Sequence, residues 1–333
     1  MSTSNSKTRK VHWGLIGSGT IASKVASSLA GPPTSEVVAV AARDLGRAQE
    51  FARKFSIPRA YGSYDEMLAS SDVDAVYVNT PNSLHHAHTL AALRAGKHVL
   101  CEKPMAPTVR QAEEMFAAAR AAGRILMEAF MYRHHPLMRE VVKRLRAGDV
   151  GEVRYVHSTF CFDIGDKPEN VRLSKPLQGG AIMDIGCYCV NFARTAVGQE
   201  PDRIFATGHV GKYGVDEWTA ATLGFPGGAS ATAVCAVQCA APTIAQVFGS
   251  GGMIEIASPW MAGEPQVTFK YKKAGAKEAE TVVVQAPNNR YYCQTETFNA
   301  AVLDGAPLIV TPEDTLGNTR VIEALHKIIG LKW

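Results

Sequence analysis

Two glycines follow the first apolar run of the chain at a spacing that suits phosphate binding. The segment Val11–Ile16 leads into Gly17-Ser18-Gly19-Thr20-Ile21-Ala22, a G-x-G-x-x-A pattern. Gly17 would make a tight turn, Gly19 would let the backbone approach a pyrophosphate, and Ala22 would allow a helix to pack closely on a strand. The N–H groups at the start of that helix would face the phosphates. The alternative is a purely structural glycine turn, but the strand before the pattern and the helix after it favour a dinucleotide site.

The residue after the second predicted strand bears on the choice of dinucleotide. NAD enzymes usually place Asp or Glu there to bind the ribose hydroxyls. This chain has Ala42 followed by Arg43. A guanidinium offers a charge-assisted partner for a 2′-phosphate, so NADP is favoured over NAD. The alternative is that Arg43 is solvated and Asp44 holds the ribose.

The elements around these motifs alternate between short apolar runs and helical patterns up to about residue 130. This alternation predicts a parallel, doubly wound sheet, and therefore an α/β dinucleotide-binding (Rossmann) domain over residues 11–132. The expected strands are Val11–Ile16, Val37–Ala41, Ala75–Asn79, His98–Cys101 and Ile125–Glu128. The expected helices are Ala22–Leu29, Gly46–Phe55, Leu84–Ala95 and Val109–Ala122.

The pattern then changes to successive strands, which predicts an α+β domain with a large, mostly antiparallel sheet over residues 133–333. Its expected strands are 153–162, 204–209, 220–225, 230–237, 247–249, 253–256, 267–271 and 281–284. Helices are expected at Pro136–Ala147, Ala181–Ala196, Cys293–Asp304 and Pro312–Ile329.

Composition excludes several classes of protein. A length of 333 residues suits two domains, and a net charge of +4 without a basic block interleaved with aromatics argues against nucleic-acid binding. The polar N-terminus, residues 1–10, is expected to be a disordered lead-in rather than a signal, and no apolar run is long enough to span a membrane. The seven cysteines show no metal spacing, which suggests reduced, buried thiols in a cytoplasmic protein.

A family resemblance emerges from motifs spread along the chain. The stretch Gly96–Pro104, ending in Cys-Glu-Lys-Pro, resembles a signature of the Gfo/Idh/MocA oxidoreductase superfamily. The resemblance continues through Asn79-Thr80-Pro81-Asn82 with His85, through Met127–Arg133, and through Gly179–Tyr188. Within the superfamily the chain is most similar to NADP-dependent D-xylose 1-dehydrogenases, glucose-fructose oxidoreductase and dimeric dihydrodiol dehydrogenases.

The resemblance implies roles for individual residues. Four would lie along the cofactor, namely Thr80, Pro81, Asn82 and His85. Glu102 would contact the nicotinamide side and Lys103 would reach the substrate hydroxyl. In relatives the Lys103-Pro104 bond is often cis, which would aim the lysine into the cleft. Met131, Arg133 and Phe160 would contact substrate, although dihydrodiol dehydrogenases usually have tryptophan where Met131 stands. That departure favours a sugar, and core packing remains an alternative for Phe160.

Oxidation of an alcohol needs a group that takes the hydroxyl proton, and Tyr188 matches the family's candidate. Because an ordinary tyrosine is a poor base at neutral pH, we expect the Lys103 ammonium to lower its pKa. Asp184 and Tyr188 are four residues apart, so one helix face would carry both and Asp184 would orient the substrate. Whether Lys103 or Tyr188 accepts the proton is left open. A solvated lysine and a core tyrosine are the alternative interpretations.

These residues predict an NADP-dependent dehydrogenase of an aldose or cyclic polyol. The alternatives are a trans-dihydrodiol dehydrogenase, a keto-sugar reductase, whose relatives usually carry His in place of Tyr188, and a non-catalytic NADP sensor. The histidines His85, His86 and His88 lack partners to complete a metal site, so no metal is expected. His134 and His135 are either cleft residues or exposed at a helix start. Relatives commonly dimerise through the open face of the C-terminal sheet, for which the stretch 231–241 is suitable.

Overall fold

The computed structural model describes residues 9–333. Residues 1–8 of the predicted lead-in therefore lie outside the described part of the chain. The last two residues of the predicted lead-in, Arg9 and Lys10, have no regular structure. Lys10 nevertheless pairs with Glu36 at an Nζ–Oε2 distance of 3.2 Å.

Within the described residues the first half of the chain forms a parallel sheet of six strands in the order β3-β2-β1-β4-β5-β6. The strands are β1 Val11–Ile16, β2 Ser35–Ala41, β3 Arg59–Tyr61, β4 Ala75–Val78, β5 His98–Glu102 and β6 Leu126–Ala129. The predicted parallel α/β sheet is confirmed, but the short β3 was missed. The strand order reverses between β1 and β4, and ligands bind at the carboxyl ends of strands beside such a reversal.

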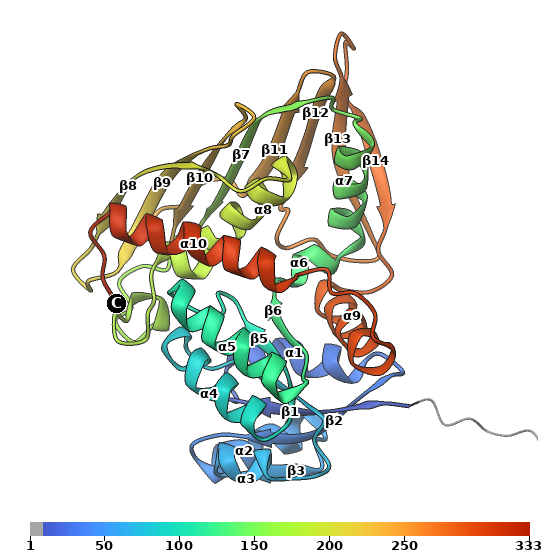
Figure 1. The fold of residues 1–333 in the computed structure, drawn as a ribbon, viewed down its shortest axis with the longest axis vertical. Helices are drawn as coiled ribbons and strands as arrows, with labels where there is room; N and C mark the ends of the chain where they lie inside the picture. Colours follow the sequence, from blue (N-terminus) through green and yellow to red (C-terminus); the bar gives the residue numbers. More distant parts are fainter. Residues whose placement is uncertain (1–8) are drawn as a thin grey trace, which may run out of the picture.

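Helices follow the strands as the alternating pattern predicts (Figure 1). They are α1 Thr20–Ala30, α2 Leu45–Phe55, α3 Tyr64–Leu68, α4 Asn82–Arg94 and α5 Val109–Ala122, followed by α6 Met131–His134 and α7 Pro136–Ala147. Two short helices, α3 and α6, were not predicted because five or four residues carry too little periodicity to be recognised. Strands β1, β4 and β5 are buried almost completely, which explains their continuous apolar runs.

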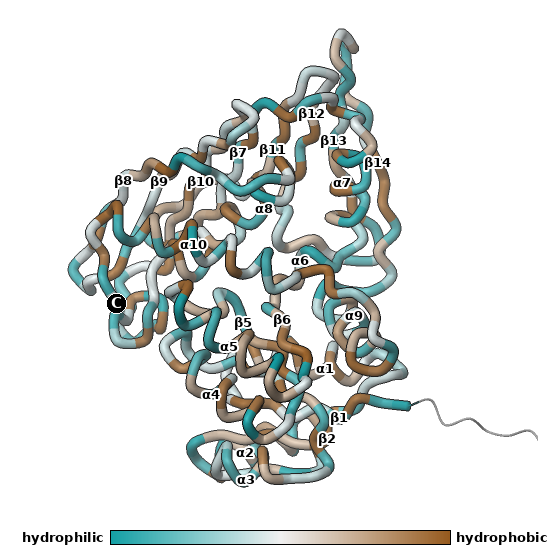
Figure 2. The backbone as a smooth tube through the Cα atoms, viewed as in Figure 1, coloured by the Kyte–Doolittle hydropathy of each residue, from teal (hydrophilic) through white to brown (hydrophobic). Residues whose placement is uncertain are grey.

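The second half forms a sheet of eight strands in the order β14-β13-β12-β11-β7-β10-β9-β8. The strands are β7 Val153–Cys161, β8 Arg203–Val210, β9 Asp216–Gly224, β10 Ser230–Ala236, β11 Ile244–Gly249, β12 Gly252–Ala257, β13 Gln266–Lys273 and β14 Glu280–Gln285. All neighbours are antiparallel except β7 and β10. The predicted mostly antiparallel sheet is confirmed, and its alternating hydropathy is visible in Figure 2.

Helix α7 and two of the three remaining helices, α8 Cys187–Val197 and α10 Pro312–Ile328, cover one face of this sheet (Figure 1). The expected continuous helix from Ala181 instead starts with a π-helical segment, Ile182–Gly186, and continues as α8. Helices α9 Arg290–Asp304 and α10 end the chain. Helix α10 packs on α5 and β8, while α9 packs on α1 and α6. The end of the chain thus returns to the first sheet and ties the two halves together.

Two surface predictions need correction. In the stretch 231–241, Ala231, Ala233 and Cys235 point into the core beside α8, because side chains alternate along a strand. The thiols are not all buried, since Cys239 is exposed and Cys293 is half-buried.

Among the described residues, no helix combines the length and apolarity that a membrane crossing needs.

Candidate active site

The glycine turn after β1 is shaped for a phosphate group. Gly17 has a φ of +108°, and a Cβ there would lie 2.9 Å from the side-chain oxygen of Asn79. Gly19 stands before the first turn of α1 with open space around it, and no side chain caps the helix start. The first N–H groups of α1 are therefore free to bind an anion. This geometry fits a dinucleotide pyrophosphate at Gly17, Ser18, Gly19, Thr20 and Ile21.

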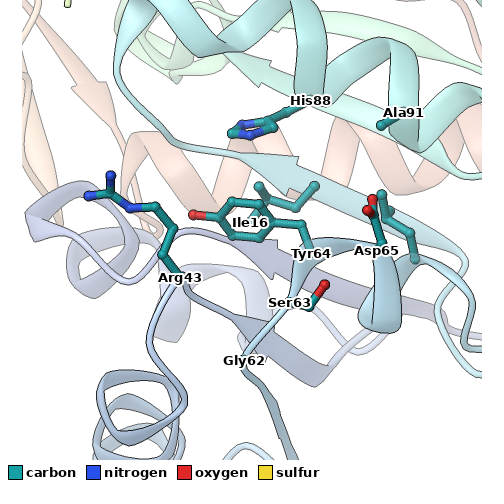
Figure 3. Close-up of a pocket in the computed structure, with 9 residues that line it drawn as sticks. Ile16, Arg43, Gly62, Ser63, Tyr64, Asp65, His88 and Ala91 are labelled. Atoms are coloured by element: carbon teal, nitrogen blue, oxygen red, sulfur yellow. The ribbon is translucent and has the colours of Figure 1, made fainter.

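A cavity of about 440 Å³ lies next to this turn. Its walls are Ile16, Arg43, Gly62, Ser63, Tyr64, Asp65, Leu68, His88 and Ala91. Figure 3 shows the Arg43 guanidinium beside the Tyr64 hydroxyl at one end and Asp65 at the other. Asp44, the alternative ribose partner, caps α2 by accepting from the Arg47 backbone N–H at 2.8 Å. The cavity therefore offers a cation and hydroxyls at the place where a dinucleotide ribose would lie.

The turn Thr80-Pro81-Asn82 follows β4, and His85 lies one helical turn further on. The His85 ring is buried, with Nε2 at 2.8 Å from the Thr80 carbonyl oxygen and Nδ1 at 3.0 Å from that of Pro104. Burial lowers its pKa to about 4, so the ring is neutral and donates to one carbonyl at a time. His85 therefore joins the turn after β4 to the segment after β5, and its place along the cofactor stays a prediction. Asn82 donates to the Gln178 carbonyl at 2.7 Å, across the two halves of the chain.

Lys103 lies just beyond the end of β5 and is buried among polar groups. Its Nζ donates to the Asp184 backbone oxygen at 2.6 Å and lies 3.4 Å from Asp184 Oδ1. Glu102 holds the backbone at Lys103, because its carboxylate accepts from the Lys103 N–H at 3.1 Å. The same carboxylate accepts from the Tyr77 hydroxyl. The Lys103-Pro104 bond is cis. The expected neighbours Glu102, Lys103 and Asp184 thus form one connected cluster.

Tyr188 joins the cluster through its ring and not through its hydroxyl. Lys103 Nζ lies 5.0 Å from the ring centroid, whereas the hydroxyl donates to the Met131 sulfur at 3.2 Å. Burial raises the pKa of Tyr188 well above its ordinary value, and Tyr291 and Glu102 act in the same direction. The expectation that Lys103 lowers this pKa is therefore wrong for this state of the site. The reason is that burial penalises the phenolate and the ammonium faces the ring.

Lys103 also retains its proton. Burial is the largest single influence and disfavours the ammonium, but Asp184, Cys187 and Glu102 together outweigh it and raise the pKa of Lys103 above its ordinary value. Asp184 is affected oppositely, because Lys103 and Arg172 lower its pKa despite burial. At neutral pH the cluster holds a protonated lysine, a protonated tyrosine and an ionised aspartate.

Aromatic side chains enclose the apolar side of this cluster. The Tyr188 ring lies within 6 Å, between centroids, of Phe130 at 5.5 Å, Tyr132 at 5.7 Å, Phe160 at 5.7 Å and Trp260 at 5.9 Å. Phe160 is only half-buried, so part of its ring remains accessible. The arrangement combines a polar edge with an apolar wall.

Arg133, expected among the substrate contacts, is held by side chains of α8 and α10. One Nη donates to Asp314 of α10 at 2.7 Å and to Asn191 of α8 at 3.0 Å.

His134 and His135 are both buried, which excludes the exposed positions considered above. His86 lies 2.8 Å from Glu114. Within residues 9–333, no three His, Cys, Asp or Glu side chains gather in a way that could hold a metal ion.

Sequence reasoning missed several residues at the site. Arg172 reaches Asp184 from the loop after β7, Trp260 enters from the loop after β12, and Tyr291 lies at the start of α9. Tyr77 and Tyr64 complete the set on the cofactor side. Arg172, Trp260 and Tyr291 lie in or beside loops, where no local pattern marks which side chain reaches inward.

Comparison with known proteins agrees with this geometry. Residues 11–130 match the oxidoreductase family NAD-binding Rossmann fold model, and residues 138–255 match the GFO/IDH/MocA C-terminal domain. Trans-1,2-dihydrobenzene-1,2-diol dehydrogenase of Mus musculus is 39% identical over 266 residues, 79% of each chain. The 3-ketoreductase KijD10 of Actinomadura kijaniata, solved with NADP, has a TM-score of 0.88 at 30% identity and covers 96% of this chain and 98% of its own. An aldose-aldose oxidoreductase of Caulobacter crescentus has a TM-score of 0.87 at 33% identity, covering 97% and 98%. The chain is an oxidoreductase and belongs to the GFO/IDH/MocA family.

Proposed function

We propose that this protein transfers hydride reversibly between NADP and a secondary alcohol of a cyclic vicinal diol, with a sugar or cyclic polyol as the leading substrate class. The observation that carries the proposal is that Lys103 Nζ contacts both Asp184 and the Tyr188 ring. Lys103 follows β5 and the glycine turn follows β1, so both lie at the carboxyl edge of the parallel sheet, and the Tyr188 ring belongs to the aromatic wall. NADP, when bound, accepts or supplies the hydride.

The residues of the cluster have complementary roles in this proposal. Lys103 binds the reacting oxygen and exchanges its proton, since general acid-base groups must lie within hydrogen-bond reach of that proton. Asp184 holds Lys103 and accepts from a neighbouring hydroxyl. Tyr188 and Phe160 pack against the apolar side of the ring. A non-catalytic sensor would not need this cluster of opposite charges beside its nucleotide turn.

A trans-dihydrodiol is the second candidate, and two observations favour it. The mammalian dihydrodiol dehydrogenases are 34% to 39% identical to the chain. The wall around Tyr188 is aromatic even with Met131 in the position usually held by tryptophan. An unsaturated ring would suit that wall, and the polar edge would serve the diol equally well.

The test is absorbance at 340 nm across aldoses, cyclic polyols, keto-sugars and aromatic dihydrodiols, with NADP and NAD compared for each. Turnover of one class with NADP would support the proposal and name the class. Nucleotide binding in a calorimeter without turnover of any class would refute it in favour of a sensor.

Arg43 provides the first prediction, on cofactor choice. Charge-assisted hydrogen bonds contribute about 1.5–3 kcal/mol. We therefore expect Arg43→Gln to raise KM for NADP by about 10- to 100-fold and to leave KM for NAD unchanged. Arg53→Gln, an exposed arginine near the other end of α2 and outside the lining of this cavity, is the matched control. Equal changes for both nucleotides would show that Arg43 does not contact the 2′-phosphate.

The protonation states predict different pH dependences for the two directions. Because the pKa values of Lys103 and Tyr188 are both raised, both side chains hold a proton at neutral pH. Reduction of a ketone should therefore be fast at pH 7 and keep that rate up to about pH 10, since the pKa of Lys103 lies above its ordinary value of 10.5. Oxidation of the alcohol should rise as pH increases. Initial rates in both directions from pH 6 to 10 would check this, and an oxidative optimum below pH 7 would contradict it.

We also propose that two copies associate through the uncovered face of the large sheet. Phe205, Trp218 and Val283 are exposed at 64%, 42% and 50%. Strand register places Phe205 opposite Thr222 and Trp218 opposite His209, away from the core. Light scattering should give a dimer mass, and Trp218→Glu should shift it toward monomer. A monomeric wild type would contradict the proposal.

A further inference from the structure

Arg172 contacts the candidate active site from a loop that no motif identifies. It belongs to the short 3-10 turn Val171–Leu173, and its Nε donates to Asp184 Oδ2 at 2.5 Å. The other oxygen, Oδ1, lies 3.4 Å from Lys103 Nζ. Two cations therefore share one carboxylate, with one on each oxygen.

The loop around Arg172 is built to hold this contact. The Arg172 N–H donates to the Asn170 side chain at 3.0 Å, and its carbonyl accepts from the Gly180 N–H at 2.8 Å. Gly179 has no side chain, and a Cβ there would clash with the Arg172 carbonyl. Gly180 has a φ of +103°, and a Cβ there would clash with the buried Asp216. The two glycines let the loop lie directly against the helix start that carries Asp184.

The guanidinium itself has a fixed position and unused donors. Its central carbon lies 5.6 Å from the Phe162 ring centroid, within the range of a cation-π contact. The side chain is 37% exposed, far more than Asp184 at 19% or Lys103 at 13%. Within residues 9–333, the Nε hydrogen bond to Asp184 is the one hydrogen bond that the Arg172 side chain makes. Arg172 thus lies at the open side of the cluster.

The groups that face Lys103 determine how firmly it holds a proton. They are Glu102 from β5, Asp184 from the π-helical segment, Cys187 and the Tyr188 ring from α8, Tyr291 from α9, His85 from α4, and Arg172. His85 is neutral near pH 7, so Arg172 is the permanent cation of this set. Like charges disfavour each other, and a carboxylate shared with a second cation supports the first one less.

We propose that Arg172 is a positioning residue that fixes the Asp184 carboxylate so that Oδ1 faces Lys103, and that its charge limits how strongly Lys103 retains its proton. The inference deepens the proposed function and rests on it for the catalytic consequence. Its electrostatic part concerns side chains of this chain alone and can be measured without turnover.

The experiment compares Arg172→Gln and Arg172→Lys with wild type. For alcohol oxidation, the pH at which kcat/KM stops rising should increase by about one pH unit in Arg172→Gln. At any pH below that point, kcat/KM of this variant should be about tenfold lower than that of wild type. Arg172→Lys keeps the charge and should leave that pH close to its wild-type value. Arg110→Gln, an exposed arginine of α5 paired with Glu114, should change neither value.

A second readout separates failure of this inference from failure of the proposed function. NMR titration of ¹³Cε-labelled lysine, with the Lys103 signal assigned from Lys103→Met, measures its pKa in the free protein. Arg172→Gln should raise that pKa relative to wild type and Arg172→Lys. An unmoved Lys103 titration, with or without a loss of kcat, would overturn the inference. If no alcohol is turned over by wild type, the proposed function fails and the titration still decides the role of Arg172.

Discussion

Lys103→Met should lower kcat for both directions by about 10²- to 10⁴-fold, the range over which a positioned acid or base contributes. The ammonium is the group in the cluster with both a donor contact to Asp184 and a position over the Tyr188 ring. Methionine keeps the length of the side chain without a proton to exchange. The loss should appear mainly in kcat, because the phosphate turn and the Arg43 cavity lie on other elements.

The control for this change is Lys143→Met on α7, where the lysine is 79% exposed and pairs with Glu140 on the same helix. Its kcat should match wild type. The affinity for NADP, measured by calorimetry, should be similar for wild type, Lys103→Met and Lys143→Met. If Lys103→Met retained more than a tenth of the wild-type kcat while Tyr188→Phe lost activity, the proton would have to pass through Tyr188 and the assignment to Lys103 would be wrong.

Arg194→Met should destabilise the protein by about 1.5–3 kcal/mol, because it removes buried hydrogen bonds to charged groups while Asp314 keeps Arg133 as a partner. Arg194 of α8 is 3% exposed and donates to Asp314 at 3.0 Å, to Asn318 at 3.4 Å and to Glu200 at 2.8 Å. Gly317 makes room for the guanidinium, since a Cβ there would clash with it. Burial disfavours the charge, but Glu200 and Asp314 raise the pKa of Arg194 overall.

The same network reaches the first half of the chain through Arg133, which also donates to Asp314. Loss of Arg194 should therefore loosen α10 from both halves and lower the denaturant midpoint in a cooperative transition. Arg110→Met is the matched surface change, with an arginine that is 76% exposed, and should cost less than about 1 kcal/mol. Equal losses in the two variants would show that the buried network adds nothing to stability.

The elements that could be predicted are those whose signal is local. Helices α5 and α7 begin and end at the expected residues because Thr108 caps the first, Pro136 begins the second, and Gly123 and Gly148 follow them in left-handed conformations. The shorter β3 and α3 lacked such signals. The break at the start of α8 was missed because the turn from Ile182 to Gly186 differs from an α-helix in backbone pairing and not in residue pattern.

The candidate site was predictable only where its residues belong to motifs. Gly17, Gly19, Lys103, Asp184 and Tyr188 lie in stretches that the sequence marks by spacing or by family resemblance. Arg172 and Trp260 lie in loops, and their approach to Asp184 and Tyr188 depends on how distant segments pack. A single sequence contains no local trace of that packing.

By itself, the sequence determined the parallel first sheet, the mostly antiparallel second sheet, the glycine turn at the start of α1 and the oxidoreductase family. Periodicity, turn chemistry and contiguous motifs are properties of neighbouring residues, so they can be recognised without the fold. The return of α9 to the first sheet, where Asn299 accepts from Trp13 at 3.2 Å, is visible only in the folded chain. The raised pKa values of Tyr188 and Lys103 likewise appear only there. Protonation depends on burial and on charges brought close from far along the chain, and these exist only after folding.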